Sequence, residues 1–162
     1  RTQPIHEQVT RTQQNISAYQ DHPQKTAPTK AGQIMSNPVT SLPMDASAND
    51  AWQLFKQTHY RYLPVVDQHN HLTGILSERD LLFSLIDRPA GKQLPDNLQA
   101  LIKHQVLSAT EDTDIRQLAF TMQEQRLGAM PIVDRHDYLV GIITRSDLLK
   151  LLSAYGSLRL QT

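Results

Sequence analysis

The sequence contains one structural unit written twice, and this repeat limits the folds that the chain can adopt. Shifted by 67 residues, the stretch PVVDQHNHLTGILSERDLL from Pro64 aligns without a gap to PIVDRHDYLVGIITRSDLL from Pro131, with 10 of 19 residues identical. The repeated units lie near residues 31–86 and 98–153. Because a three-stranded sheet is too small to bury its apolar face alone, we expect the two units to pack together about a pseudo-twofold axis.

Within each unit, the hydrophobic pattern predicts the element order β-α-β-β-α. A short extended segment comes first, at Val39–Leu42 and Val106–Ala109. Apolar residues at i, i+3, i+4 and i+7 then predict an amphipathic helix; they are Ala48, Ala51, Trp52 and Phe55, repeated as Ile115, Leu118, Ala119 and Met122. Two strands separated by a polar turn follow, at Leu63–Val66 and Leu72–Leu76, repeated at Met130–Val133 and Leu139–Ile143. We therefore predict an α+β fold with two small mixed three-stranded sheets and their helices.

Three segments lie outside the repeated units. Residues 87–97 contain two prolines and a glycine, which predicts a linker. Residues 1–30 form a polar N-terminal arm whose composition is typical of disorder. Apolar residues between Ile5 and Tyr19 nevertheless step by three and four, so we expect a helical arm docked on the module or on a second copy. Residues 154–162 are a C-terminal tail.

Charge and composition disfavour several classes of function. Lys plus Arg equals Asp plus Glu at 16 each, whereas nucleic-acid binders usually carry a basic excess. The absence of cysteine excludes disulfides and thiolate metal sites, and it fits a cytoplasmic protein. No apolar run approaches the ~18–20 residues of a membrane span. No catalytic motif appears. From the charge balance, the lack of a long apolar run and the lack of a catalytic motif, we expect no nucleic-acid partner, no membrane insertion and no enzyme activity, respectively.

The junction between the last strand and the last helix of each unit allows two interpretations. It reads GILSERDLL at residues 74–82 and GIITRSDLL at residues 141–149. A Ser or Thr followed three residues later by an acid is typical of a helix capping box. The same residues suit a nucleotide, because a helix start favours phosphate and a carboxylate accepts hydrogen bonds from ribose hydroxyls. The residues alone leave both interpretations open.

The repeated pattern resembles a known family. LPVVD…GILSERDLL, repeated as MPIVD…GIITRSDLL, resembles the CBS domain, and the pair over residues 31–153 resembles a Bateman module. The resemblance implies adenosine compounds bound in two clefts between the units: AMP, ADP or ATP, and less often S-adenosylmethionine or NAD. It implies that Asp80 and Asp147 hold ribose hydroxyls and that Ser77 and Thr144 touch the phosphates.

By the same resemblance, each cleft takes its second wall from the other unit. Tyr60–Tyr62 would face Asp147, with Arg61 neutralising phosphate and Tyr62 stacking or hydrogen-bonding. Leu127–Ala129 would face Asp80 and is small and apolar.

Each cleft also has a nearby cation, Arg79 in the first and Arg145 in the second. We expect the cleft with Thr144 and Asp147 to be the better equipped, and we expect no metal site. His69, His71 and His136 are interpreted as turn residues, and Trp52 as a core residue.

Together these features predict a regulatory module that senses an adenosine nucleotide and signals to a partner domain or protein, and we expect the module to form a homodimer. The rival hypothesis is a ligand-independent dimerisation or interaction module in which the capping boxes are purely structural. A third hypothesis is that the chain, which begins at Arg1, is the regulatory part of a larger enzyme or transporter.

Overall fold

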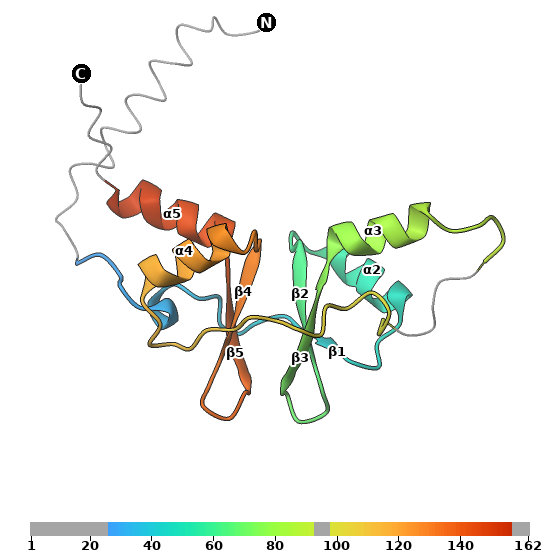
Figure 1. Cartoon of the computed structure of the whole chain (residues 1–162), viewed down its shortest axis with the longest axis horizontal. Helices are drawn as coiled ribbons and strands as arrows, with labels where there is room; N and C mark the ends of the chain where they lie inside the picture. Colours follow the sequence, from blue (N-terminus) through green and yellow to red (C-terminus); the bar gives the residue numbers. More distant parts are fainter. Residues whose placement is uncertain (1–25, 93–97, 157–162) are drawn as a thin grey trace, which may run out of the picture.

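The computed structural model of the chain describes residues 26–92 and 98–156. A short 3-10 helix η1 (Ala31–Gln33) opens the first unit, which also contains β1 (Leu42–Pro43), α2 (Ala48–Gln57), β2 (Tyr62–Val66), β3 (Leu72–Ser77) and α3 (Glu78–Ile86). The second unit contains α4 (Ile115–Glu124), β4 (Ala129–Val133), β5 (Leu139–Thr144) and α5 (Arg145–Tyr155). The α+β fold class is confirmed (Figure 1). The predicted arm at Ile5–Tyr19 lies outside the described residues.

The predicted helix faces are the ones that enter the core. In α2 the buried residues are Ala48, Ala51 and Phe55, and in α4 they are Ile115, Leu118 and Met122. Trp52 packs partly buried against the core of the first unit, as predicted. None of the helices in the described parts of the chain is long and apolar enough to cross a membrane.

The two sheets differ in their first strand. In the first unit, β1 pairs in parallel with β2, and β2 pairs antiparallel with β3. In the second unit, β4 and β5 form the hairpin, but the third strand is reduced to one parallel bridge between Ala109 and Ile132. Thr110 then donates its backbone N–H to Thr113 Oγ1 at 3.0 Å, which turns the chain away from β4. The prediction of three strands is therefore correct for the first sheet and wrong for the second.

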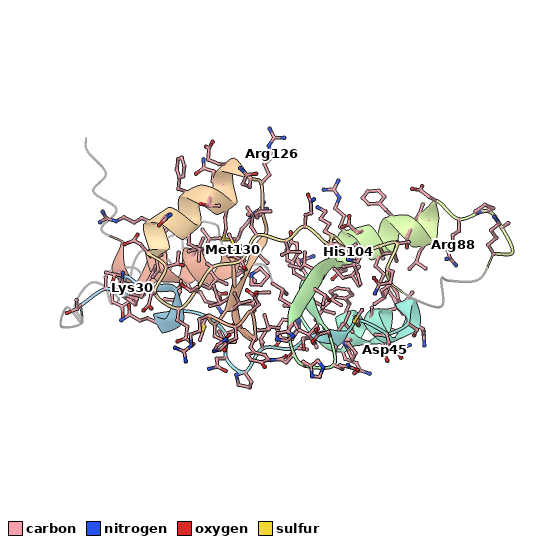
Figure 2. All side chains as sticks on the ribbon, turned by 60° about the horizontal axis from the view of Figure 1, so that its bottom comes forward. Lys30, Asp45, Arg88, His104, Arg126 and Met130 are labelled. Atoms are coloured by element: carbon pink, nitrogen blue, oxygen red, sulfur yellow. The ribbon has the colours of Figure 1, made fainter. Side chains whose placement is uncertain are left out.

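The segment that opens each unit packs in the other unit, an exchange that the sequence analysis missed. Ala31 is buried in the core of the second unit, and Ser36 N donates to Ile142 O at 2.9 Å. Conversely, Leu98 and Ile102 are buried in the core of the first unit. In Figure 2, Lys30 accordingly lies among elements of the second unit, whereas His104 lies beside β3.

The exchanged segments explain one glycine in each repeat. A Cβ on Gly74 would collide with Ile102 Cγ2 and lie 2.9 Å from the Lys103 carbonyl oxygen. A Cβ on Gly141 would lie 2.5 Å from Met35 Sδ. The first residue of the GILS and GIIT motifs therefore has to be small, because an exchanged segment crosses directly over it.

The hairpin turns of the two units meet on the pseudo-twofold axis, which is vertical between the two halves in Figure 1. The rings of His71 and Tyr138, which occupy equivalent positions in the repeat, stack with centroids 4.6 Å apart. Leu72 N donates to Asp137 O at 3.2 Å, and Leu139 N donates to Asn70 O at 3.1 Å. These reciprocal bonds confirm that the units pack about a pseudo-twofold axis.

Candidate functional site

The two strand–helix junctions lie on the sheet faces that look toward the other unit. Side chains alternate between the faces of a strand, and Leu63 and Val65 of β2 enter the core of their own unit. Tyr62 therefore lies on the opposite face, where it pairs across the sheet with Ser77. The equivalent pair in the second unit is Ala129 with Thr144. Both junctions thus face the space between the units, at the end of the sheets away from the hairpin turns.

At the start of α3 only half of the predicted capping box forms. Ser77 Oγ accepts a hydrogen bond from Asp80 N at 3.0 Å. Within the described residues, no hydrogen bond or ion pair involves the Asp80 carboxylate, which is half-buried. The cap explains Ser77, but it leaves both carboxylate oxygens of Asp80 without a structural role.

At the start of α5 the carboxylate is engaged. Asp147 Oδ2 accepts from Thr144 N at 2.8 Å and from Thr144 Oγ1 at 3.2 Å. The Thr144 hydroxyl has one hydrogen, and this hydrogen is directed to Asp147. The carboxylate-to-amide half of the predicted box is therefore present here, and it is the half that α3 lacks.

A groove of about 550 Å³ lies at the start of α3 and brings together four of the predicted site residues. They are Arg61, Tyr62, Ser77 and Arg79. The groove is completed by residues of α3 that the sequence analysis did not select, namely Glu78, Leu82, Phe83 and Ile86. Leu82 and Ile86 are four residues apart, a spacing that in sequence alone indicates a core-facing helix stripe.

Two contacts hold this groove together. Glu78 N donates to Arg61 O at 2.9 Å, which ties the residue before β2 to the first turn of α3. The Arg79 guanidinium carbon lies 5.2 Å from the centroid of the Phe83 ring, within the range of a cation–π contact.

Arg61 and Tyr62, predicted to face Asp147, line a groove along α3, and their placement opposite Asp147 stays a prediction. The other predicted site residues, Asp80, Thr144, Arg145 and Asp147, do not line this groove.

Tyr62 links the groove to the second unit. Its ring lies so close to Gly128 that a Cβ on this glycine would collide with the phenol, with Cε2 at 2.6 Å. Gly128 O in turn accepts from Arg145 N at 3.2 Å. The Tyr62 phenol therefore contacts Gly128, whose carbonyl oxygen binds the first residue of α5, Arg145. A side chain at position 128 would collide with the Tyr62 ring, so this position requires glycine.

A second cavity, of about 520 Å³, lies at the opposite end of the interface near the hairpin turns. Its polar lining includes Asp67, His71, His136 and Asp137. Asp67 has its pKa lowered from the usual 3.8, chiefly because the backbone N–H of His71 donates to its carboxylate. In the described ranges, no three His, Cys, Asp or Glu side chains are grouped as metal ligands.

Comparison with known proteins identifies the family. Residues 31–87 and 98–154 each match the family model of the CBS domain. The chain belongs to the CBS domain family. It is a tandem CBS pair, as the repeat predicted.

Solved CBS pairs show the same fold and hold adenosine compounds. The CBS pair of protein MJ0100, solved with 5'-methylthioadenosine and S-adenosylmethionine, is 25% identical, with a TM-score of 0.69 over 77% of this chain and 97% of that one. CBSX2, solved with AMP, is also 25% identical, with a TM-score of 0.64 over 76% of this chain and 95% of that one.

A region similar to this chain also occurs within a longer enzyme. The L-aspartate semialdehyde sulfurtransferase of Methanocaldococcus jannaschii is 26% identical over 132 residues, which is 82% of this chain but 25% of the enzyme. This chain therefore matches only about a quarter of the length of that relative.

Proposed function

We propose that this CBS pair is a regulatory module that binds an adenosine nucleotide of the AMP, ADP and ATP class in the clefts between its units. The observation that carries the proposal is the pair of junctions facing the interface, each with a hydroxyl and a carboxylate at a helix start. The alternative of a purely structural capping box accounts for Ser77 and Thr144. It leaves the free carboxylate of Asp80 without an explanation.

Each part of a nucleotide has a matching group at the start of α3, where Asp80 follows the groove-lining Arg79 in the first turn without lining the groove itself. The Ser77 hydroxyl and the guanidinium groups of Arg61 and Arg79 suit phosphate oxygens. The Asp80 carboxylate suits the two ribose hydroxyls, and the Tyr62 ring offers a surface on which a base can stack. In the cleft at α5 the corresponding groups are Thr144, Arg145 and Asp147.

The contact between Tyr62 and Gly128 offers a route for the signal. Tyr62 already contacts the second unit at Gly128. A ligand that packs on the Tyr62 ring can therefore favour one arrangement of the two units over another. The shift of this equilibrium is limited to the difference in affinity of the ligand for the two arrangements. A partner domain or protein in contact with both units would read out the change.

Phosphate-bearing ligands fit this surface better than S-adenosylmethionine. The α3 groove has two arginines, which favour anions, whereas S-adenosylmethionine carries a positive sulfonium next to its ribose. NAD carries phosphates, but its second nucleoside requires further room along the cleft. Both compounds remain useful competitors because the MJ0100 pair was solved with S-adenosylmethionine.

A thermal-shift titration with AMP, ADP, ATP, S-adenosylmethionine and NAD tests the proposal. A ligand that binds only the folded state stabilises it by RT ln(1 + [L]/Kd), about 2.7 kcal/mol at a hundredfold excess over Kd. For a domain of this size the melting temperature then rises by about 5–11 °C. A saturable rise with a phosphate-bearing adenosine compound supports the proposal. No rise with any of the five compounds at millimolar concentration would overturn it.

A second candidate function is a dimerisation or interaction module, which exposed apolar side chains on two helices favour. Phe83 and Ile86 of α3 are 49% and 74% exposed, and Leu149 and Leu152 of α5 are 65% and 62% exposed. Because α3 and α5 are equivalent in the repeat, a second copy related by a twofold axis can cover both faces at once. We therefore propose a homodimer through these helices, in which the second copy covers the apolar edge of the groove formed by Phe83 and Ile86.

Sedimentation of the full chain tests the dimer. Leu152→Glu places a charge in the proposed contact and should shift the chain toward the monomer. Lys103→Glu, at an exposed residue between the linker and α4, should leave the oligomeric state unchanged. A monomeric wild-type chain, or a dimer that Leu152→Glu leaves intact, would contradict the dimer.

The proposed role is compatible with a place inside a longer protein. The M. jannaschii relative contains its matching region within a longer enzyme, so this pair could likewise regulate an attached enzyme or transporter. A cytoplasmic location, expected from the lack of cysteine, would expose the module to adenosine nucleotides. We assign no catalytic role to its residues.

A further inference from the structure

We infer that the two clefts are unequal and that the cleft at the start of α3 binds the nucleotide more tightly than the cleft at the start of α5. This inference rests on the proposed function and reverses the order expected from sequence. It follows from the hydrogen bonds that each cleft already makes and from the groups that line the groove.

At α3 the groups required by a nucleotide are available. Ser77 Oγ serves as acceptor for Asp80 N, so the hydroxyl hydrogen is free to donate to a phosphate oxygen. Both oxygens of the Asp80 carboxylate are without a hydrogen bond among the described residues. A nucleotide can therefore bind without breaking a hydrogen bond of the protein.

At α5 the corresponding groups are already used. The Thr144 hydroxyl donates to Asp147 Oδ2 at 3.2 Å, and the same oxygen accepts from Thr144 N at 2.8 Å. To donate to a phosphate, Thr144 must first release Asp147. To accept two ribose hydroxyls, Asp147 has one uncommitted oxygen and must share the other.

The groove adds groups that have no counterpart in the second unit. Arg61 and Tyr62 line it, and the repeat replaces them with Gly128 and Ala129. Net charge alone does not separate the clefts, because Glu78 lines the groove and offsets one arginine. The difference lies in the number of guanidinium groups within the groove and in the aromatic surface beside them.

Calorimetric titration of AMP into the full chain compares Asp80→Asn with Asp147→Asn. Both substitutions preserve the shape of the side chain. In Asp80→Asn the backbone N–H of residue 80 still donates to Ser77 Oγ, and in Asp147→Asn the side-chain amide oxygen can still accept from Thr144 N. We expect Asp80→Asn to weaken the tighter binding event by about ten- to a hundredfold, the range for lost hydrogen bonds to a charged group. We expect Asp147→Asn to leave that event within about twofold of wild type.

A matched pair of arginine variants separates the phosphate contact from the rest of the site. Arg61→Gln should weaken AMP by about two- to fivefold, the range for an exposed ion pair, and leave adenosine unchanged. Arg145→Gln should leave the tighter AMP event unchanged. Arg116→Gln, on an exposed residue of α4, is the control for loss of one positive charge.

The outcomes distinguish this inference from the proposed function. If Asp147→Asn removes the tighter event, or if both aspartate variants weaken it equally, the ranking of the clefts is wrong while nucleotide binding stands. If the wild-type chain binds none of the adenosine compounds, the proposed function fails and the ranking fails with it.

Discussion

Replacing Gly74 with alanine tests whether the exchange of segments between the units holds the molecule together. The new Cβ would collide with Ile102 Cγ2 and lie 2.9 Å from the Lys103 carbonyl oxygen, inside van der Waals contact with both. Ile102 is buried and β-branched, and Lys103 exchanges two backbone hydrogen bonds with Ile75 at 3.2 Å. Neither neighbour can move without disrupting this pairing.

Overpacking of this kind typically costs about 1–3 kcal/mol. For a chain of this size, that cost corresponds to a melting temperature lower by about 2–12 °C. Gly141→Ala is the matched control, because its nearest neighbour is Met35 Sδ at 2.5 Å and the methionine side chain is flexible. We expect it to be the milder substitution.

Urea unfolding of Gly74→Ala, Gly141→Ala, Ile102→Ala and the double variant Gly74→Ala/Ile102→Ala measures these free energies. Because Ile102→Ala removes the colliding methyl group, the double variant should be more stable than the sum of its two single changes predicts. A Gly74→Ala variant as stable as wild type, or strictly additive effects, would show that the exchanged segment does not press on β3.

Two further substitutions probe the hairpin end of the interface. Asp67 has a lowered pKa, so its contribution to stability is complete above about pH 4–5 and is lost as the pH falls below the usual value of 3.8 toward its folded value. Unfolding free energies measured from pH 6 to pH 3 should therefore fall less steeply for Asp67→Asn than for wild type, and identical slopes would contradict the assignment. Asn70 Nδ2 donates to Leu139 O at 3.1 Å, whereas the ionised carboxylate of its counterpart Asp137 cannot donate. Asp137→Asn should therefore add the equivalent bond to Leu72 O and raise stability by about 0.5–1.5 kcal/mol, and an unchanged urea midpoint would exclude this bond.

The elements of each unit could be predicted because their signals are local. The spacing of Ala48, Ala51 and Phe55 predicted a helix face, and each of these residues is buried in α2. The repeat then doubled the evidence for every strand and turn. The hydroxyl and acid at each helix start also correctly marked where α3 and α5 begin.

The exchange could not be predicted because it depends on contacts between residues far apart in the chain. The segment around Ala31 is too short to show a period, and its partners lie at residues 111–113. The repeat aligned this segment with residues near Leu98 but did not indicate in which unit each would pack.

The difference between the two clefts was also outside the reach of sequence. Ser77 and Asp80 read like Thr144 and Asp147, yet only the second pair forms a hydrogen bond through the carboxylate. Which oxygen binds which hydrogen depends on side-chain rotamers. The contact of Tyr62 with Gly128 likewise depends on how closely the two units approach, which no local pattern records.

A crystal structure of the chain grown with AMP tests the central claim most directly. The account predicts AMP between the units, with its ribose hydroxyls on the Asp80 carboxylate and its phosphate at Ser77 and the start of α3. Occupancy of the Thr144 and Asp147 cleft alone would preserve nucleotide binding but reverse the order of the sites. AMP bound only in the cavity near the hairpin turns, or in neither place at millimolar concentration, would contradict the account.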